Sequence, residues 1–148
     1  AGLVLAAQPL VMACTAPFSG SLSDRVGSRP PATVGMVILG ASLLALAFTA
    51  PTAPLPVVAL LLACAGLGIG LFASPNNSAL MGAAPRGRQG IASAILATAR
   101  NVGMVLGVGA AGAILTTQGH AALAPGVQLS LGFGAVVALA GSVLSWLR

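Results

Sequence analysis

Hydrophobic residues gather in five long runs along the chain, and short polar links separate these runs. The runs cover residues 1–19, 32–50, 57–82, 90–116 and 127–147. A helix that crosses a membrane needs about 20 mostly apolar residues. Each run therefore predicts one transmembrane helix, and the pattern as a whole predicts an all-α membrane protein. Pro75 lies inside the third run and is expected to kink that helix.

The composition indicates that lipid, rather than water, surrounds most of this chain. Of its 148 residues, 57% are hydrophobic and 5% are charged, whereas a soluble domain has roughly 25% charged residues. So few charges cannot cover a globule with a hydrated surface, which disfavours the alternative of a soluble helical protein. The six basic residues are all arginines, and they are too scattered to form the basic face of a nucleic-acid-binding protein.

Arginines fall on alternate links, which predicts how the helices are oriented. Arg25 and Arg29 lie between the first and second runs, and Arg86 and Arg88 lie between the third and fourth. Arg148 follows the fifth run. The positive-inside rule assigns the side that carries these arginines to the cytoplasm. We therefore expect a multi-pass protein of the cell membrane whose arginine-bearing links and C-terminus are cytoplasmic.

Small residues recur at helical spacing on the third, fourth and fifth runs. Lipid gives helices no hydrophobic drive to associate, so close backbone approach at small residues takes over that role. We predict that the following positions pack helices together: Gly66, Gly70, Gly103, Gly107, Ala111, Gly134 and Gly141.

Arg100 is the charge that the pattern explains least. It lies about 12 residues beyond the preceding link, roughly 18 Å along a helix, and so near the middle of a bilayer. A charge at that depth normally faces a packed interior or a water-filled cavity. Asn76 and Asn77 lie about as far from the same link on the third run. We therefore expect them to share a candidate substrate cavity with Arg100 and Asn101. A structural arginine, satisfied by amides and carbonyls or snorkelling to the interface, is the alternative.

The sequence holds no pattern that predicts an enzyme, a cofactor site or a metal site. Residues 68–73 and 107–112 match the glycine pattern of dinucleotide-binding loops. Such a site also needs an acidic residue about 20 positions further on, and Asp24 is the only acidic residue in the chain. One aspartate and one histidine on separate links cannot form an acid–base pair inside a membrane. We interpret Cys14 and Cys64 as buried thiols, not as a disulfide or metal ligands.

A polar stretch between the first and second runs has a distinctive pattern. It reads Gly20-x-Leu22-Ser23-Asp24-Arg25-x-Gly27-x-Arg29. Its charges can stay hydrated at a membrane surface, which predicts a loop over residues 20–31. The pattern resembles the motif A loop of the major facilitator superfamily, G-x-L-[AS]-D-R-x-G-[RK]-[RK]. It departs from the family at Ser28, where a basic residue is usual.

Further segments extend this resemblance over most of the chain. Residues 67–78, 90–94 and 100–107 are similar to the C-terminal half of the 14-span drug:proton antiporter branch. Members have two six-helix halves around a central cavity and alternate between inward-open and outward-open states. The resemblance implies that the five runs are the second to sixth helices of a C-terminal half. The chain would then be a fragment without the first helix of that half and without the N-terminal half.

The resemblance also makes the motif A stretch a candidate conformational gate. In the family, the aspartate sits near the positive end of a helix in the opposite half, where a carboxylate is favoured by roughly 0.3–1 kcal/mol. Asp24 would then be a latch between the halves. Arg25 and Arg29 would tune this latch, while Gly20 and Gly27 would allow tight passage of the backbone. The alternative for Asp24 is a solvated carboxylate paired with a nearby arginine.

The function that the resemblance implies is secondary active efflux of small, often lipophilic molecules, without a cofactor. The implied partners are the lipid bilayer, a small-molecule substrate and the missing N-terminal half. Proton carriers in the family are usually carboxylates within the membrane, and none of the five runs contains one. We therefore expect any proton coupling to reside in the full-length parent. The rival hypothesis is a membrane remnant that packs with other helices and transports nothing.

Overall fold

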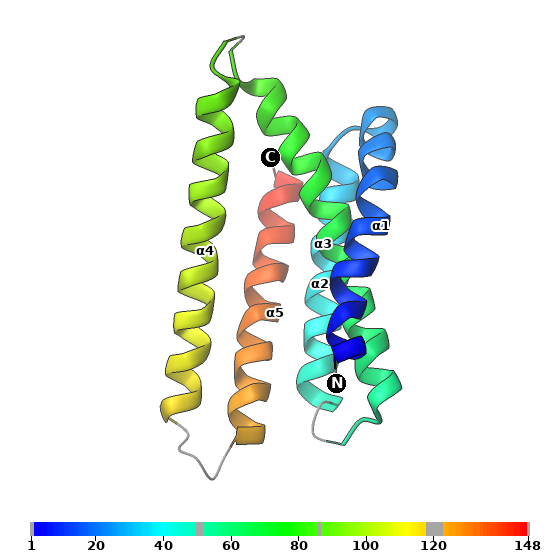
Figure 1. The fold of residues 1–148 in the computed structure, drawn as a ribbon, viewed down its shortest axis with the longest axis vertical. Helices are drawn as coiled ribbons and strands as arrows, with labels where there is room; N and C mark the ends of the chain where they lie inside the picture. Colours follow the sequence, from blue (N-terminus) through cyan, green and yellow to red (C-terminus); the bar gives the residue numbers. More distant parts are fainter. Residues whose placement is uncertain (1, 50–51, 86, 118–122, 148) are drawn as a thin grey trace.

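The computed structural model describes residues 2–49, 52–85, 87–117 and 123–147, and these residues form helices joined by short links (Figure 1). The helices are α1 (Gly2–Val26), α2 (Arg29–Thr49), α3 (Leu55–Ala83), α4 (Gln89–Thr117) and α5 (Leu123–Leu147). The described residues contain no strand. The predicted all-α fold class is therefore confirmed.

Four of the described helices, α2 to α5, are long and apolar enough to cross a membrane. α1 has 25 residues but is not among these four. It contains Pro9 and Pro17, and it ends with the polar residues Asp24 and Arg25. The crossing that the sequence predicts for the first run therefore stays a prediction.

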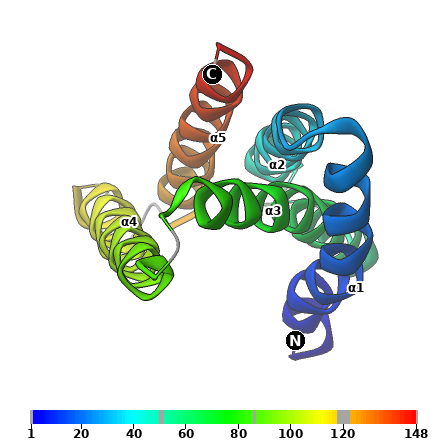
Figure 2. The ribbon, with the colours of Figure 1, turned by 90° about the horizontal axis from the view of Figure 1, so that it is seen from above.

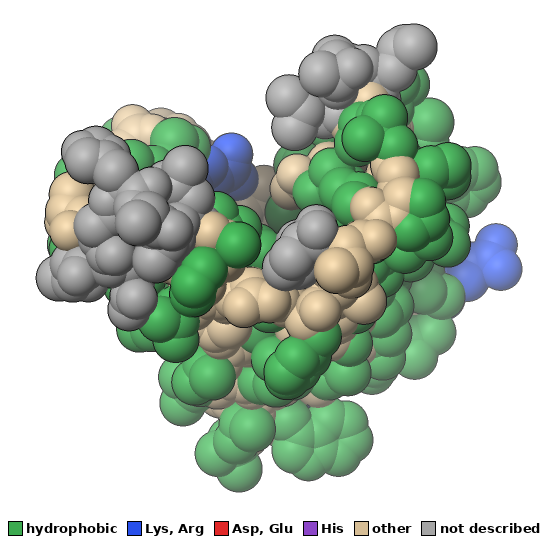
Figure 3. Space-filling view, turned by 90° about the horizontal axis from the view of Figure 1, so that it is seen from below, with side chains coloured by type: hydrophobic (Ala, Val, Ile, Leu, Met, Phe, Trp, Pro, Cys, Tyr) green, Lys and Arg blue, Asp and Glu red, His purple; other side chains and the backbone are tan. Residues whose placement is uncertain are grey.

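The outer surface of the bundle is apolar. Large hydrophobic side chains are widely exposed, among them Phe18 at 73%, Phe48 at 80% and Val108 at 70%. Figure 3 shows hydrophobic side chains over most of the face seen from below. A surface of this kind would be unstable in water, because apolar area in contact with water is unfavourable. It is suited to contact with lipid.

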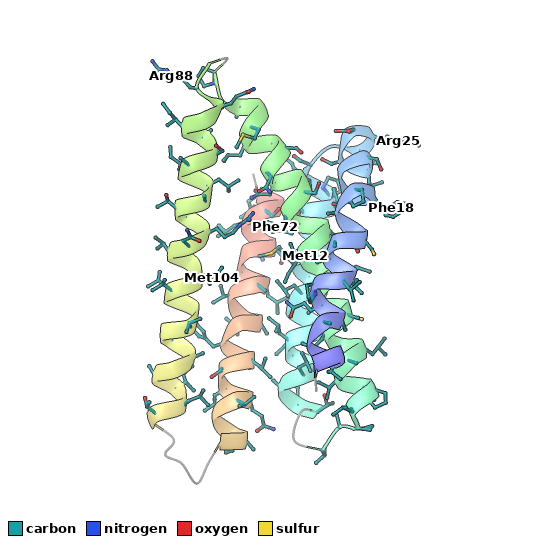
Figure 4. The ribbon with its side chains drawn as sticks, in the orientation of Figure 1. Met12, Phe18, Arg25, Phe72, Arg88 and Met104 are labelled. Carbon is teal, nitrogen blue, oxygen red and sulfur yellow. The ribbon has the colours of Figure 1, made fainter. Side chains whose placement is uncertain are left out.

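The helices run alternately up and down, so the arginine-bearing links lie at one end of the bundle (Figure 1). Arg25 at the end of α1 and Arg88 before α4 are both at that end (Figure 4). The structure thus agrees with the alternation of arginines along the sequence. Arg86 and Arg148 lie outside the described residues.

α3 holds the bundle together, and α4 stands apart from it. α3 packs along both α1 and α2, and α2 packs along α5, whereas the contacts of α4 are slight and are mainly with α5 and α3. Figure 2 shows α4 separated from the other helices when the bundle is seen from above. No described residue in the membrane-spanning part of α4 is buried.

The polar stretch at residues 20–31 is not the loop that the sequence predicts. α1 continues to Val26 and α2 begins at Arg29, so only Gly27 and Ser28 are outside a helix. Gly27 has φ +89° and its N–H donates to the Ser23 carbonyl at 2.9 Å. A glycine in this left-handed conformation ends a helix sharply, which explains why the charged residues before it remain helical.

The expectation for the two cysteines is also corrected. Both thiols are free, but Cys14 is exposed and Cys64 is only partly buried. Cys14 lies on a side of α1 that the packed neighbours of this helix do not cover. A small apolar residue is tolerated on such a face, so low polarity alone did not predict burial.

Candidate functional site

A cavity of about 420 Å³ lies between α1, α3 and α4. One residue comes from α1, five come from α3 and two come from α4. The lining consists of Met12, Ile69, Phe72, Ala73, Asn76, Asn77, Leu96 and Arg100.

The cavity joins Arg100 to both predicted asparagines, although these residues come from different helices. α3 and α4 are antiparallel and share a short link, so residues equally far from that link reach the same depth. Asn76 and Asn77 are half-buried, whereas Arg100 is exposed because α4 has few neighbours. The structure thus places these three side chains around one space.

The rest of the lining is apolar, and this limits what the cavity can hold. Met12 and Phe72 lie at similar heights on α1 and α3 (Figure 4), and Ile69 and Leu96 complete the walls. A guanidinium has five N–H donors and no acceptor, while each amide offers both donors and acceptors. No described lining residue is acidic. The arrangement therefore suits a mostly apolar molecule that carries several hydrogen-bond acceptors.

Asn101 does not line this cavity. Successive helix residues point about 100° apart at 3.6 residues per turn, and the Asn101 side chain is exposed beside Arg100. The structure therefore separates Asn101 from the other three candidate residues.

The motif A residues lie at the arginine-bearing end of α1 and at the start of α2. Asp24 and Arg25 are exposed in the last turn of α1, and Leu22 is 44% exposed. Gly20 packs against α3, because a Cβ at this position would lie 3.2 Å from Ser74 Oγ. Arg29 begins α2 and lines a second pocket, of about 520 Å³, with Trp146 of α5.

The predicted packing glycines of α3 face α1. A Cβ built on Gly66 would overlap the Gln8 backbone, and one on Gly70 would lie 3.1 Å from the Met12 carbonyl oxygen. Contacts this close are possible only without a side chain, so these glycines set the distance between α1 and α3.

On α5, the two predicted packing glycines face α2. A Cβ on Gly134 would lie 3.5 Å from Leu43 Cδ1, and one on Gly141 would meet the flexible end of Met36. α4 differs, because a Cβ on Gly103 or Gly107 would have no described atom within 4 Å.

Ala111 of α4 is half-buried. The packing role predicted for Gly103 and Gly107 therefore has no partner among the described helices, and the role predicted for Ala111 stays a prediction.

Sequence reasoning missed a close backbone contact between α2 and α3. A Cβ on Gly35 of α2 would lie 2.6 Å from the Gly68 carbonyl oxygen, and one on Gly68 would lie 2.7 Å from the Gly35 carbonyl oxygen. The second and third apolar runs each contain one of these glycines, but the local sequence pattern does not indicate which glycine of one helix meets which glycine of the other.

A family model for the Major Facilitator Superfamily matches residues 1–148. The chain belongs to the Major Facilitator Superfamily. Together with the four apolar helices, this membership indicates a multi-pass membrane protein. Among the described residues, no group of three or more His, Cys, Asp or Glu side chains could hold a metal ion.

Several curated members of this superfamily are similar to the chain. The riboflavin transporter RibZ of Clostridioides difficile is 38% identical over 107 residues, which are 72% of this chain and 24% of that protein. The uncharacterized transporter YebQ of Escherichia coli is 34% identical over 148 residues, 99% of this chain and 31% of that protein. The multidrug resistance protein Stp of Mycobacterium tuberculosis is 31% identical over 127 residues, 86% of this chain and 24% of that protein.

The chain spans about a quarter to a third of the length of these superfamily members. They are named transporters rather than enzymes. No solved structure gives a significant match to the chain.

Proposed function

We propose that this chain forms part of a secondary transporter that moves a small molecule through the cavity of Arg100, Asn76 and Asn77. The observation that carries the proposal is the cavity itself, in which polar side chains of two antiparallel helices meet at one depth within an apolar bundle. Charged residues inside transmembrane segments mark substrate and ion pathways by default. Alternating access around this site is the mode of transport that superfamily membership suggests.

Efflux of lipophilic molecules is our first candidate for the task of the whole protein. Similarity to a multidrug resistance protein supports it, as do the apolar walls of the cavity. Proton coupling would require a titrating group elsewhere in the complete protein, because Asp24 is the only acidic residue of this sequence. The chain would then work together with an N-terminal half, a bilayer and a small-molecule substrate.

Transport of an acceptor-rich planar molecule is our second candidate. The similar riboflavin transporter supports it, and so does the chemistry of the lining. A guanidinium and two amides can donate hydrogen bonds to several carbonyl or ring-nitrogen acceptors at once. The lining has no described carboxylate that would attract a cationic drug.

Location and gating are parts of the same proposal. We infer a cell-membrane protein whose arginine-bearing links are cytoplasmic, because Arg25 and Arg88 share one end of the bundle. Asp24 is the proposed latch of the gate. Its exposed position in the last turn of α1 leaves it available to a helix of the opposite half.

The decisive experiment replaces Arg100 in the complete gene product that carries this chain. Flux of ethidium and of riboflavin is measured in membrane vesicles for Arg100→Leu, Arg100→Lys and a control, Thr98→Val. Thr98 is an exposed residue of the same helix that donates to Ala94 and does not line the cavity. Loss of a hydrogen bond from a charged group should lower the flux about 10- to 100-fold in Arg100→Leu. We expect Arg100→Lys to keep part of the wild-type flux and Thr98→Val to keep all of it.

Two results would count against this assignment. If Arg100→Leu transports either probe normally, the cavity is not the substrate site. If Arg100→Leu fails to insert into the membrane while Thr98→Val inserts, Arg100 is a structural residue. A complete gene product that moves no tested probe would favour the rival hypothesis of a remnant that only packs with other helices.

A further inference from the structure

A buried hydroxyl connects α1 with α3 beside the cavity. Ser19 is fully buried, and its Oγ donates to the Leu71 carbonyl oxygen on α3 at 3.0 Å. Most other hydroxyls among the described hydrogen bonds donate to a carbonyl of their own helix, as the buried Ser42 does to Ile38 at 2.8 Å. Thr33 of α2 also approaches the Ser145 hydroxyl of α5 at 3.3 Å, but that partner is a side chain and not a backbone carbonyl. The Ser19 hydroxyl therefore satisfies a backbone carbonyl of a neighbouring helix rather than a carbonyl of its own helix.

The Leu71 carbonyl needs an external donor because of the proline four residues later. In a regular helix, the N–H of residue 75 would donate to the carbonyl of residue 71, but Pro75 has no N–H. A carbonyl left unsatisfied in an apolar interior is costly. Ser19 supplies the donor that Pro75 lacks. The missing backbone hydrogen bond of the continuous helix α3, here called the Pro75 break, is therefore compensated only while α1 lies against α3.

The surroundings leave little room for another donor. Pro75 is fully buried. On one side, a Cβ at Gly20 of α1 would lie 3.2 Å from Ser74 Oγ. On the other side, a Cβ at Gly35 of α2 would lie 3.0 Å from Leu71 Cβ. Helices therefore cover the break from two directions, and Ser19 is the side chain that reaches the carbonyl.

The break lies directly before the polar residues of the cavity. Asn76 and Asn77 follow Pro75 in α3 and line the cavity with Arg100. The C-terminal end of α3 lies farther from α1 and nearer to α4 than the N-terminal end of α3 does (Figure 1). The backbone geometry at Pro75 therefore affects where the two amides lie relative to Arg100.

We propose that Ser19 is a positioning residue of the cavity, which holds the Pro75 break through Leu71 and thereby orients Asn76 and Asn77. The functional meaning of this role rests on the proposed transport function. Ser19 directly precedes Gly20, the first residue of the motif A stretch. A displacement of that stretch therefore reaches the cavity through one hydrogen bond, which links the gate to the substrate site.

The test measures the direction of α3 beyond the break, independently of transport. Spin labels are placed on Val34→Cys of α2 and Gly82→Cys of α3 in the complete gene product, in a cysteine-free background that includes Cys14→Ala and Cys64→Ala. Both labelled positions are exposed, and neither lines the cavity. Pulsed electron resonance then gives the distribution of distances between the two labels.

Four variants are compared: Ser19→Ala, Pro75→Ala, the double variant and the control Ser42→Ala. We expect Ser19→Ala to change the ratio of populated distances about threefold, the size typical of an interhelical hydrogen bond in a membrane. Ser42→Ala should change nothing, because its bond stays within α2. Pro75→Ala restores the helical N–H, so adding Ser19→Ala in that background should have no further effect.

An unchanged distribution in Ser19→Ala would overturn the proposal. An equal change in the presence and absence of Pro75 would overturn it too, because the effect would then be general packing rather than the Leu71 carbonyl. Ethidium and riboflavin flux of the same variants is read separately. A distance change in a protein that transports neither probe supports the positioning role and counts against the transport assignment.

Discussion

In the proposed substrate site, Arg100 would be the strongest single source of selectivity. Its guanidinium donates in up to five directions and accepts in none. Asn76 and Asn77 are the other polar groups of the lining, and Met12 and Phe72 supply apolar surface. At the scale of residues, we therefore propose that the site would discriminate substrates by the number and spacing of acceptors on an otherwise apolar molecule.

Asn77 offers a test of this chemistry. Asn77→Asp would place a carboxylate in the cavity of Arg100, and we expect the two charges to pair and to withdraw the guanidinium from the substrate. KM for whichever of riboflavin and ethidium is transported should rise about tenfold or more, whereas Asn77→Ala should raise it roughly two- to tenfold by loss of a neutral hydrogen bond. Flux in membrane vesicles measures both values.

The neighbouring Ser78→Ala is the matched control, because Ser78 is exposed and outside the lining. Stronger binding of a cationic probe by Asn77→Asp, with no loss for the neutral probe, would show that Arg100 does not contact substrate.

Part of this site was predictable from the sequence, and the reason is geometric. Two antiparallel helices joined by a short link bring equally distant residues to one depth, which related Arg100 to Asn76 and Asn77. Met12 and Ser19 were not predictable in this way. They lie on α1, more than fifty residues earlier, and no periodic pattern states which turn of α1 meets which turn of α3.

At the scale of elements, α3 is positioned by glycines on two faces. Gly66 and Gly70 meet α1, and Gly68 meets Gly35 of α2. Apolar burial cannot distinguish one helix pairing from another in lipid, so the fit of backbones must do so. The contacts of α3 explain why it holds the bundle together.

Gly68→Ala should therefore destabilise the protein. Its Cβ would lie 2.7 Å from the Leu39 backbone nitrogen as well as from the Gly35 carbonyl oxygen, and neither backbone can move aside easily. Overpacking of this kind costs about 1–3 kcal/mol. Thermal unfolding in detergent should show a lower Tm. Gly109→Ala is the control, because a Cβ there has no described neighbour within 4 Å, and an equal loss in both variants would refute the packing role of Gly68.

The apolar runs predicted that helices exist and roughly where, because length and composition suffice for that. They did not predict the helix ends around residues 20–31. The charges of Asp24 and Arg25 suggested a loop, yet helical hydrogen bonding continues to Val26 until Gly27 takes a positive φ. A charged residue at a membrane surface is hydrated whether or not its backbone is helical, so polarity alone does not mark a helix end.

At the scale of the whole molecule, the arrangement is uneven. Three helix pairs, α1–α3, α2–α3 and α2–α5, are closely packed, while α4 is held mainly by its link to α3 and by slight contacts. The cavity lies on that weakly packed side, between α4 and the rest. Substrate binding there would act on the helix that is easiest to displace.

The orientation of the whole bundle is open to a direct test. Reporter fusions after Ser28, Ala53 and Gly87 in a bacterial host should give a cytoplasmic signal at 28 and 87 and an external signal at 53. The reason is that Arg25 and Arg88 share one end of the bundle and positive links stay in the cytoplasm. Green fluorescent protein reports a cytoplasmic fusion site, and alkaline phosphatase reports an external one. Signals from opposite compartments for 28 and 87 would contradict the fold and the orientation together.

The two-residue connection of Gly27 and Ser28 has a mechanical consequence. A connection of two residues is too short to absorb a change in the position of one helix, so when α1 tilts, the first turn of α2 must move with it. This holds even though α1 and α2 share few direct contacts. α2 in turn packs along α5. A displacement of the end of α1 is thus transmitted to α2 through the covalent connection and from α2 to α5 through helix packing. Lengthening the connection by a few flexible residues would weaken this coupling between α1 and the far side of the bundle.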